Sequence, residues 1–450
     1  STPTSNSGTI SMAVAMNNNK YDVIIVGAGI VGACIAFDLS KRGRKTLNID
    51  MLPAAGYGST SYSCAIIRTH YSNLDSTALA YESYFHWLNW ADYLGQKDDH
   101  GLAKFHHTGC LVMKTEGNQG LNPMTAHMKT LNIPWQDWSV ADILEKFPFL
   151  DLRTYAPPKL PDHADFAEPS GGQIAGAMFF PCAGYMSDPQ LCTQNVQAAA
   201  EGHGAEFRFN TRVAEITKEN NRVGGVVMEN GDRYLAPVVI NVAGPHSSKI
   251  NDMAGVSGQM ALTTRALREE VAQVDAPQGF DFEHDGVVYS DGDVGCYARP
   301  EIGNRMVVGG ENPACDPEVW VDADDYSQDL TDQARNQVMR LAQRMPSLGI
   351  PGRVAGIVSC YDVTPDWIPI YDRSLVDGFY MAIGTSGNQF KNAPVVGAMM
   401  ADLIEACEKG HDHDNDPVIF HLKRLNRPLS IGFFSRNREI NMESSFSVLG

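Results

Sequence analysis

The residues whose chemistry is easiest to interpret are three glycines near the start of the chain. Gly27-Ala28-Gly29-Ile30-Val31-Gly32 lies between an expected strand, Asp22 to Val26, and an expected helix that ends near Arg42. In this setting the first glycine permits a turn, the second lets the backbone approach a pyrophosphate, and the third lets the helix pack closely on the strand. The helix N-terminus offers unpaired N–H groups to a phosphate. The pattern predicts a dinucleotide site, and the alternative is a glycine turn in another kind of α/β protein.

A carboxylate and an isolated cation follow this motif. Asp50 closes the next expected strand, Thr46 to Asp50, where a carboxylate would accept hydrogen bonds from a ribose 2′-hydroxyl. Arg68 stands in an otherwise uncharged run, Ala54 to Thr69. Solubility does not explain an arginine there, because the protein as a whole is acidic. The alternative for Arg68 is a structural salt bridge to a carboxylate.

Composition excludes several classes of partner. The 450 residues carry 35 Lys and Arg against 53 Asp and Glu, a formal net charge of −18, which opposes binding to nucleic acid or to an anionic membrane surface. The most apolar stretch, Val23 to Phe37, is shorter than the roughly 20 residues that span a bilayer. Nine scattered cysteines with no C-x-x-C pair favour a reducing, cytoplasmic compartment and predict neither a disulfide framework nor a zinc site.

The elements that must position these residues come in three separated segments. The first is the strand, helix and strand of residues 21–50. The second is a helix from Pro189 to Glu201, a strand over 205–209 and an apolar strand, Val238 to Val242, that runs into Ala243-Gly244. The third is a strand over 379–383, a glycine-rich turn, and a helix from about Asn392 to Ala406. Together they predict an α/β protein with a discontinuous Rossmann-like, doubly wound domain.

The intervening segments predict a second, inserted domain of α+β type on a mainly antiparallel sheet. Its clearest features are a hairpin, 295–298 with 305–308, and a helix from Leu330 to Met345. A further helix is expected over 75–94, with Leu79, Tyr84, Trp87, Leu88 and Ala91 on one face. The predicted organisation is a flexible tail over 1–19, a dinucleotide domain over 20–109, 183–262 and 356–410, a substrate domain over 110–182 and 263–355, and a C-terminal extension over 411–450.

Three later segments carry a family resemblance. Residues 55–68, AGYGSTSYSCAIIR, form a Gly/Ser loop ending in an arginine, and residues 238–244 read VVINVAG. Residues 364–391, TPDWIPIYDRSLVDGFYMAIGTSGNQFK, end in a glycine-rich loop. With residues 21–50, these segments resemble the FAD-dependent D-amino-acid oxidase superfamily, most closely its sarcosine oxidase and dimethylglycine dehydrogenase branch. The resemblance implies an oxidoreductase that binds FAD rather than NAD.

The resemblance also implies roles for individual residues. Arg68 and Lys391 would hold a substrate carboxylate, Tyr361 would lie near the substrate, and His70 would face the flavin. The loop 384–391 would lie against the flavin pyrimidine ring, with the following helix stabilising negative charge there. The implied FAD-binding residues are Gly27, Ala28, Gly29, Ile30, Val31, Gly32, Asp50, Met51, Ser59, Thr60, Ser63, Val213, Ala243, Gly244, Gly384, Ser386, Gly387, Asn388, Gln389, Phe390 and Lys391.

Three positions depart from the family pattern. Ser359 stands where monomeric sarcosine oxidases attach flavin through a cysteine, and Tyr62 stands near the anchoring histidine of dimethylglycine dehydrogenases. FAD is therefore expected to bind non-covalently. Val307 occupies the region where a lysine for oxygen activation is expected. The electron acceptor is thus either O2 or another acceptor.

The function implied is oxidation of the C–N bond of a small N-substituted amino acid, with hydride transfer to flavin N5 and hydrolysis of the imine. No residue in the sequence identifies itself as the base that deprotonates the amine. A D-amino acid or a 2-hydroxy acid would also suit Arg68 and Lys391, the pair of basic residues termed here the cationic clamp. A flavoprotein that serves or matures another enzyme is the alternative of another class. The C-terminal segment, His421 to Gly450, would then contact a protein partner or a second copy through its arginines Arg424, Arg427, Arg436 and Arg438.

Overall fold

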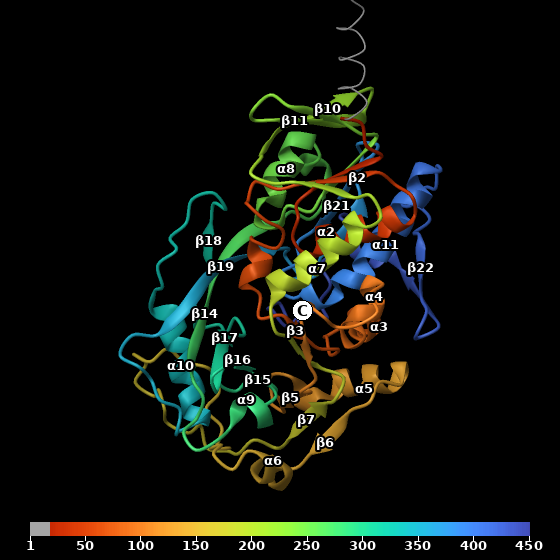
Figure 1. Cartoon of the computed structure of the whole chain (residues 1–450). Helices are drawn as coiled ribbons and strands as arrows, with labels where there is room; N and C mark the ends of the chain where they lie inside the picture. Colours follow the sequence, from red (N-terminus) through yellow and green to blue (C-terminus); the bar gives the residue numbers. More distant parts are fainter. Residues whose placement is uncertain (1–18) are drawn as a thin grey trace, which may run out of the picture.

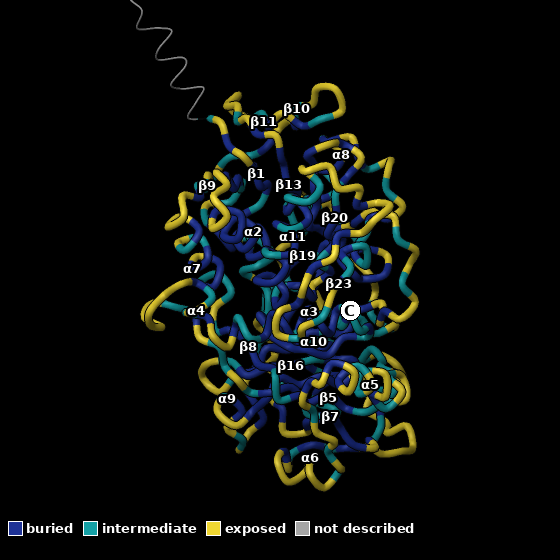
Figure 2. Tube along the Cα trace, turned by 90° about the vertical axis from the view of Figure 1, so that its right-hand side faces the viewer, coloured by how far each residue is buried: buried dark blue, intermediate teal, exposed yellow. Residues whose placement is uncertain are grey.

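The structure, a computed structural model, describes residues 19–450. The predicted flexible tail, residues 1–19, lies outside the described residues except for its last position. Two large sheets dominate the molecule, one in the upper half of Figure 1 with α2, α7 and α11, and one in the lower half with α10. Buried residues fill the interior of both halves, whereas outlying elements such as α6 and α9 carry much of the exposed surface (Figure 2).

The first sheet has the predicted Rossmann-like form. Its strand order is β20 (Ile370–Arg373), β21 (Phe379–Ile383), β13 (Val238–Asn241), β1 (Val23–Val26), β2 (Thr46–Ile49) and β9 (Glu206–Arg208). The strands from β21 to β9 are parallel, and β20 is an antiparallel edge. Strands β1, β2 and β13 are buried at every residue, which explains their apolar composition without alternation.

Each face of this sheet is covered by different elements. Helices α2 (Ile30–Lys41), α7 (Pro189–Glu201) and α11 (Ala393–Glu408) pack together on one face. The other face packs against α8 (Ser247–Ala254) and a small sheet of β10 (Val213–Glu219), β11 (Arg222–Met228) and β12 (Arg233–Leu235). A doubly wound sheet covered in this way leaves the carboxyl ends of its strands free for a ligand.

The second sheet has nine strands and is mainly antiparallel. Its order is β18 (Val319–Val321), β14 (Arg265–Asp275), β17 (Arg305–Gly310), β16 (Cys296–Glu301), β15 (Val288–Asp291), β5 (Cys110–Met113), β7 (Ala177–Phe180) and β6 (Gln136–Trp138), with β19 (Ala355–Val363) paired to β14. Among the described strand pairs of this second sheet, only β15–β5 is parallel. The predicted hairpin is present as β16 and β17, and the predicted helix over 330–345 as α10 (Asp332–Arg344).

One predicted boundary is wrong. Residues from 356 onward were assigned to the dinucleotide domain, but β19 pairs with β14 along its whole length, from Arg265 opposite Val363 to Gln273 opposite Ala355. The strand therefore belongs to the larger sheet and ends at the cavity between the two halves. The apolar run Ile357 to Val363 does not by itself indicate which sheet it joins.

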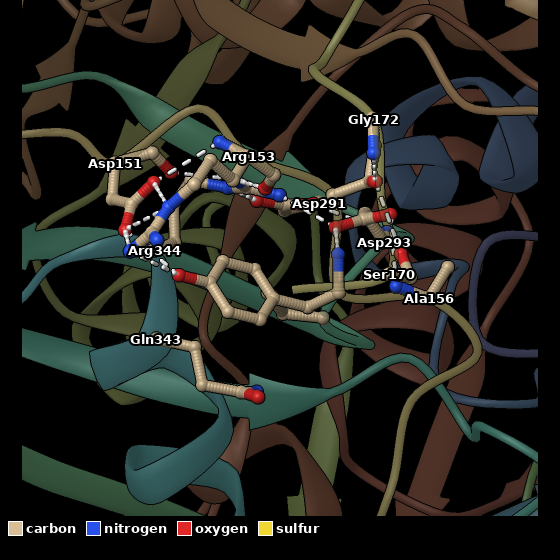
Figure 3. Close-up of polar contacts among 12 residues, drawn as sticks. Asp151, Arg153, Ala156, Ser170, Gly172, Asp291, Asp293, Gln343 and Arg344 are labelled. Atoms are coloured by element: carbon tan, nitrogen blue, oxygen red, sulfur yellow. Dashed lines mark hydrogen bonds and ion pairs between the residues drawn. The ribbon is translucent and has the colours of Figure 1, made fainter. Parts of the chain in front are cut away.

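A buried ion cluster holds the lower half together (Figure 3). Arg344 on α10 is fully buried and contacts Asp291 through Nε at 2.8 Å and Asp293 through Nη2 at 2.7 Å. Its Nη1 donates to the carbonyls of Asp151 and Arg153, both at 2.6 Å. The guanidinium thus joins the end of β15 to the loop that follows α6 (Val140–Lys146).

The helix predicted over 75–94 is broken in two. α3 (Leu74–Leu88) and α4 (Trp90–Leu94) meet at Asn89, whose φ of −117° and ψ of 54° are not helical. The break lets Trp90 stack on Trp87 with ring centroids 4.6 Å apart and donate to Asn195. Leu88, expected on the buried face, is 41% exposed.

The C-terminal segment packs on the first half rather than projecting from it. It contains the hairpin β22 (Ile419–Leu422) and β23 (Arg427–Ser430). Arg436 is ion-paired with Asp372 and Asp414, and Arg438 with Asp366. The expectation that these two arginines serve a partner is wrong, because Arg436 is buried, Arg438 is half-buried, and both are ion-paired within the chain.

The remaining elements lie outside the two large sheets. Among residues 19–450, no helix is both long and apolar enough to cross a bilayer. The other strands and α-helices are β3 (Ile66–Ile67), β4 (Phe105–His106), β8 (Gly184–Met186), α5 (Asn122–Leu131) and α9 (Phe282–Asp285).

Candidate functional site

A cavity of about 660 Å³ lies between the two halves. Its walls come from the carboxyl ends of β1, β2 and β13, the loop before β3, strands β14 and β19, the loop 384–391 and residues 448–449. The glycine motif lies at one end, termed here the dinucleotide end, and Arg68 and Lys391 lie at the other, the reaction end.

At the dinucleotide end, the glycine motif lets neighbouring atoms approach the backbone more closely than any side chain would allow. Gly27 has a φ of +125°, and a Cβ there would lie 2.1 Å from the carbonyl oxygen of Val242. A Cβ on Gly29 would lie 2.9 Å from Thr60 Oγ1. The N-cap residue of helix α2 is Gly29, which has no side chain to accept hydrogen bonds from the first turn. The N–H of Ile30 donates to Thr60 Oγ1 at 3.2 Å. An open helix N-terminus beside close-packed glycine backbone fits a pyrophosphate.

Asp50 lies at the end of β2, beside the same motif. Its Oδ2 accepts from the N–H of Ala28 at 2.9 Å and its Oδ1 from the N–H of Leu52 at 3.0 Å. Burial raises the pKa of Asp50, and these backbone donors oppose that rise. The carboxylate is therefore held in a fixed orientation at the cavity wall, which fits a ribose hydroxyl as its ligand.

A loop from the larger sheet closes over this end. Asp324 Oδ1 contacts His246 Nε2 at 2.9 Å, and Asp324 Oδ2 contacts Lys249 at 2.5 Å and Arg212 at 2.7 Å. Although burial opposes it, these contacts hold the pKa of Asp324 well below its usual range. All four side chains line the cavity, so the cluster joins the two halves at the cavity mouth.

At the reaction end, Arg68 is buried and bound by backbone carbonyls. Its Nη1 donates to the carbonyl of His70, and its Nη2 donates to Leu449 at 2.7 Å and to Val448 at 3.4 Å. The guanidinium lies 4.2 Å from the ring centroid of Tyr71. The ion pairs among the described residues do not include Arg68, so no described carboxylate contacts its guanidinium directly.

Lys391 is the second buried cation of this end. Its Nζ donates to the carbonyl of Asn388 at 2.8 Å and to the hydroxyl of Tyr71 at 3.1 Å. Burial, and then the charge of Arg68, lowers the pKa of Lys391 well below its usual value. Within the described chain Lys391 has no carboxylate partner either. An anion bound here would meet two donors and would raise the pKa of Lys391.

His70 and Tyr361 complete the predicted reaction-end residues. His70 stacks on Phe180 with centroids 4.7 Å apart, and its Nδ1 has no partner. Burial lowers the pKa of His70 well below its usual value, so the ring is neutral at physiological pH. Tyr361 packs on Gly387, where a Cβ would lie 2.7 Å from its ring.

The cavity brings together nearly all of the predicted site residues. Arg68, His70, Tyr361 and Lys391 line it, as do most of the implied FAD-binding positions. Three of those positions do not line it: Ala28, Gly384 and Ser386. Each supports the wall from behind. Ala28 binds Asp50 through its N–H, Gly384 packs on Thr364, and Ser386 binds the carbonyl of Asp362 through its N–H.

Sequence reasoning missed several residues of the reaction end. Glu269 on β14, Tyr297 on β16 and the pair Val448-Leu449 all line the cavity. No local motif marks them, because they reach the cavity through sheet pairing and through the path of the C-terminal segment. A second, smaller cavity of about 160 Å³ adjoins Cys64 and is lined by Val307 and Arg299. Arg299 pairs with Val307 across β16 and β17, which puts a cation beside the expected lysine position.

Together, a doubly wound sheet with an open glycine turn, a second sheet facing it, and buried cations in the cavity between them define a dinucleotide-dependent oxidoreductase. The family model described as "FAD dependent oxidoreductase" matches residues 22–403, and the chain belongs to that family. It is 24% identical over 402 residues to glycine oxidase of Geobacillus kaustophilus, covering 88% of this chain and 95% of the relative. It is 26% identical to sarcosine oxidase subunit beta of Rhodobacter capsulatus, covering 86% and 85%.

Solved structures give the same fold. L-proline dehydrogenase from P. horikoshii superposes with a TM-score of 0.73 at 21% identity, covering 93% of this chain and 98% of that chain. The predicted family, fold and enzyme class are thereby confirmed: the chain is an FAD-dependent oxidoreductase.

Proposed function

We propose that this protein oxidises the C–N bond of a small N-substituted amino acid whose carboxylate binds Arg68 and Lys391. The observation that carries the proposal is the pair of buried cations that line one cavity without a carboxylate partner in the described chain. A buried charge needs a partner, and an anionic substrate supplies it. The names of the relatives, glycine oxidase and sarcosine oxidase, support small amino acids as the substrate class.

The residues of the reaction end bind and orient. Arg68 is fixed by three backbone carbonyls and by the ring of Tyr71, so its remaining N–H groups hold one direction. Tyr71 also receives a hydrogen bond from Lys391, which couples the two cations through one ring. Neutral His70 leaves the positive charge of the site to Arg68 and to Lys391, whose lowered pKa rises when an anion binds beside it. When bound, FAD supplies the acceptor for the hydride of the substrate C–H bond, and water hydrolyses the imine.

Non-covalent FAD is the second part of the proposal. Ser359 and Tyr62 line the cavity where family members carry attachment residues, and neither is the cysteine or the histidine that those members use. Purified protein should be yellow and should release FAD on denaturation by acid or heat. Colour that stays with the denatured chain would contradict non-covalent binding.

The electron acceptor is proposed to be one other than O2, because Val307 replaces the expected lysine. Arg299 lies next to Val307 but donates to the carbonyl of Cys64 at 2.6 Å and contacts Glu301 at 3.3 Å. Its charge is therefore already paired. Stopped-flow reoxidation by O2 should be slow relative to flavin reduction, and rapid peroxide formation would contradict this.

A D-amino acid or a 2-hydroxy acid remains the second candidate substrate, since the cationic clamp suits either. A partner role for the C-terminal segment has weaker support, because Arg436 and Arg438 are ion-paired internally.

We place the protein in a reducing, cytoplasmic compartment. All nine cysteines are free, which supports this placement.

The deciding experiment combines substrate class with a charge deletion. Anaerobic flavin bleaching is measured with N-methylglycine, a D-amino acid, a 2-hydroxy acid and an amine that lacks a carboxylate. In Lys391→Met, binding of the carboxylate substrates should weaken by about 2–5 kcal/mol while FAD stays bound. The exposed Lys409→Met is the matched control and should change nothing. Equal losses of binding for substrates with and without a carboxylate would contradict the binding of the carboxylate by Lys391.

A further inference from the structure

The reaction end contains a buried carboxylate that the clamp does not use. Glu269 lies on β14, is 8% exposed, and lines the cavity. It pairs with Ser359 on β19, and Leu267, two residues earlier, pairs with Tyr361. Side chains two residues apart on a strand share a face, so Glu269 is on the same face of the sheet as Tyr361.

Glu269 is bound by neutral groups alone. Its Oε1 accepts from Asn312 Nδ2 at 2.7 Å, and its Oε2 accepts from Gln333 Nε2 at 2.6 Å. In the described chain no lysine, arginine or histidine forms an ion pair with it, whereas its neighbour Glu270 is paired with Arg268 at 2.5 Å. Each carboxylate oxygen of Glu269 keeps one lone pair free. A buried carboxylate in a cavity wall with spare acceptor capacity calls for a cationic or proton-donating ligand.

A short chain of hydrogen bonds connects Glu269 with Arg68. Asn312, which donates to Glu269, accepts from the N–H of Val448 at 2.9 Å. The carbonyls of Val448 and Leu449 in turn accept from Arg68 Nη2. The carboxylate and the guanidinium are thus held against the same C-terminal residues, one on each side. An amino acid bound through its carboxylate at Arg68 presents its amino group within the same end of the cavity.

We propose that Glu269 binds the ammonium group of the substrate and accepts its proton. In this step the N–H bond breaks, the proton moves to an oxygen of Glu269, and the electron pair stays on nitrogen as the lone pair that C–H oxidation requires. The inference rests on the proposed function and supplies the base that the sequence does not reveal.

The surroundings of Glu269 suit a proton acceptor. Burial raises the pKa of Glu269 to about 7, and the negative charges of Asp316 and Glu270 act in the same direction. Asp316 is itself paired with Arg340 on α10, and Glu270 with Arg268, so no free cation faces Glu269 from those elements. The other titratable groups facing it are Tyr361 and Cys360 on β19, whose pKa values are raised chiefly by burial.

The first test measures binding to the holoenzyme by perturbation of the flavin spectrum. The probes are N,N,N-trimethylglycine, a zwitterion whose quaternary ammonium group has no N–H and cannot react, and 3,3-dimethylbutanoate, the carboxylate isostere in which a neutral tert-butyl group replaces the ammonium. At pH 8.5 the wild type should prefer N,N,N-trimethylglycine over 3,3-dimethylbutanoate by about 10-fold or more, and Glu269→Gln should abolish the preference. At pH 5.5 the wild-type preference should shrink, because Glu269 is then protonated.

Glu311→Gln is the matched control. Glu311 is also a buried carboxylate, its pKa raised by burial to about 8 although the charge of Arg68 opposes the rise; it accepts from Ser290 and does not line the cavity. The preference should persist in this variant. Loss of the preference in Glu311→Gln but not in Glu269→Gln would overturn the assignment.

The second test follows flavin reduction by N-methylglycine against pH. The rate should rise through pH 7 in the wild type and in Glu311→Gln, and this rise should be absent in Glu269→Gln. An unchanged rise in Glu269→Gln would overturn the proton-acceptor role. Binding of both probes without preference, together with normal reduction by N-methylglycine, would sink this inference and keep the proposed function. Failure of both probes to bind would overturn both.

Discussion

The two ends of the cavity are built in different ways. The dinucleotide end is made largely by the backbone of one continuous segment, from Val26 to Asp50, and its key feature is missing side chains. The reaction end is made by side chains from separate segments, with Arg68, Glu269 and Lys391 on three of them. The dinucleotide end offers a phosphate group a close approach to the backbone, which only glycine permits. The second binds through charges that the fold buries without internal partners.

The sharpest test of this comparison is a methyl group at the dinucleotide end. In Gly27→Ala the Cβ would lie 2.1 Å from the backbone carbonyl oxygen of Val242, which cannot move aside as a flexible side chain could. The φ of +125° is also unfavourable for alanine. We expect FAD binding to be lost altogether, measured as flavin content after purification. Gly43→Ala is the control, since its φ is +84° but nothing lies within 4 Å; it should cost about 1 kcal/mol and keep FAD.

The second test asks whether the half of the molecule that contains the second sheet depends on buried charge for its stability. Arg344→Met leaves Asp291 and Asp293 buried without a cation, which should lower the free energy of unfolding by about 3–5 kcal/mol. The neighbouring Arg153→Met removes an exposed ion pair and should cost less than about 1 kcal/mol. Chemical denaturation of both variants measures the difference. Equal losses of unfolding free energy in the two variants would mean that the buried ion pairs of Arg344 stabilise the fold no more than an exposed pair does.

A third test uses the pH dependence of stability. Burial raises the pKa of Glu311 to about 8, above its ordinary 4.5. Below pH 4.5 the group is protonated in both states; as pH rises toward 8 the unfolded chain loses the proton first, so the folded state is progressively disfavoured. Glu311→Gln should therefore gain about 4 kcal/mol of stability relative to wild type between pH 5 and pH 8.5, at about 1.4 kcal/mol per pH unit. A constant difference across this range would contradict the raised pKa.

The smallest expected effect concerns the loop that closes the dinucleotide end. Asp324→Asn weakens its contacts with Lys249 and Arg212, which are partly exposed, so FAD affinity should fall by about 1 kcal/mol or less. The wild-type affinity should approach that of the variant at high salt, because salt screens such pairs. Asp275→Asn, at a carboxylate 90% exposed, is the control for charge alone. FAD titration at two salt concentrations decides whether charge contributes at this end as well.

The sequence predicted the dinucleotide end well because its signals are local. The motif from Gly27 to Gly32, Asp50 at the end of β2 and the helix α7 all lie within a few residues of their expected places. The reaction end was predicted only where a family motif marked it, at Arg68 and Lys391. Glu269 gave no signal, because its position depends on the pairing of β14 with β19, about 90 residues further along the chain. For the same reason the predicted domain boundary at residues 355 and 356 falls inside β19.

The strand order of the first sheet has a consequence for synthesis of the chain. Strand β1 lies in the centre of the sheet, between β2 and β13. Val23 and its partner Val238 are separated by about 215 residues, so one edge of β1 stays unpaired until β13 has been made. At roughly 5–20 residues per second that interval is about 10–45 s. A fully apolar strand edge exposed for so long is prone to aggregate, and yields of active enzyme should respond to translation rate and to chaperones that bind extended apolar segments.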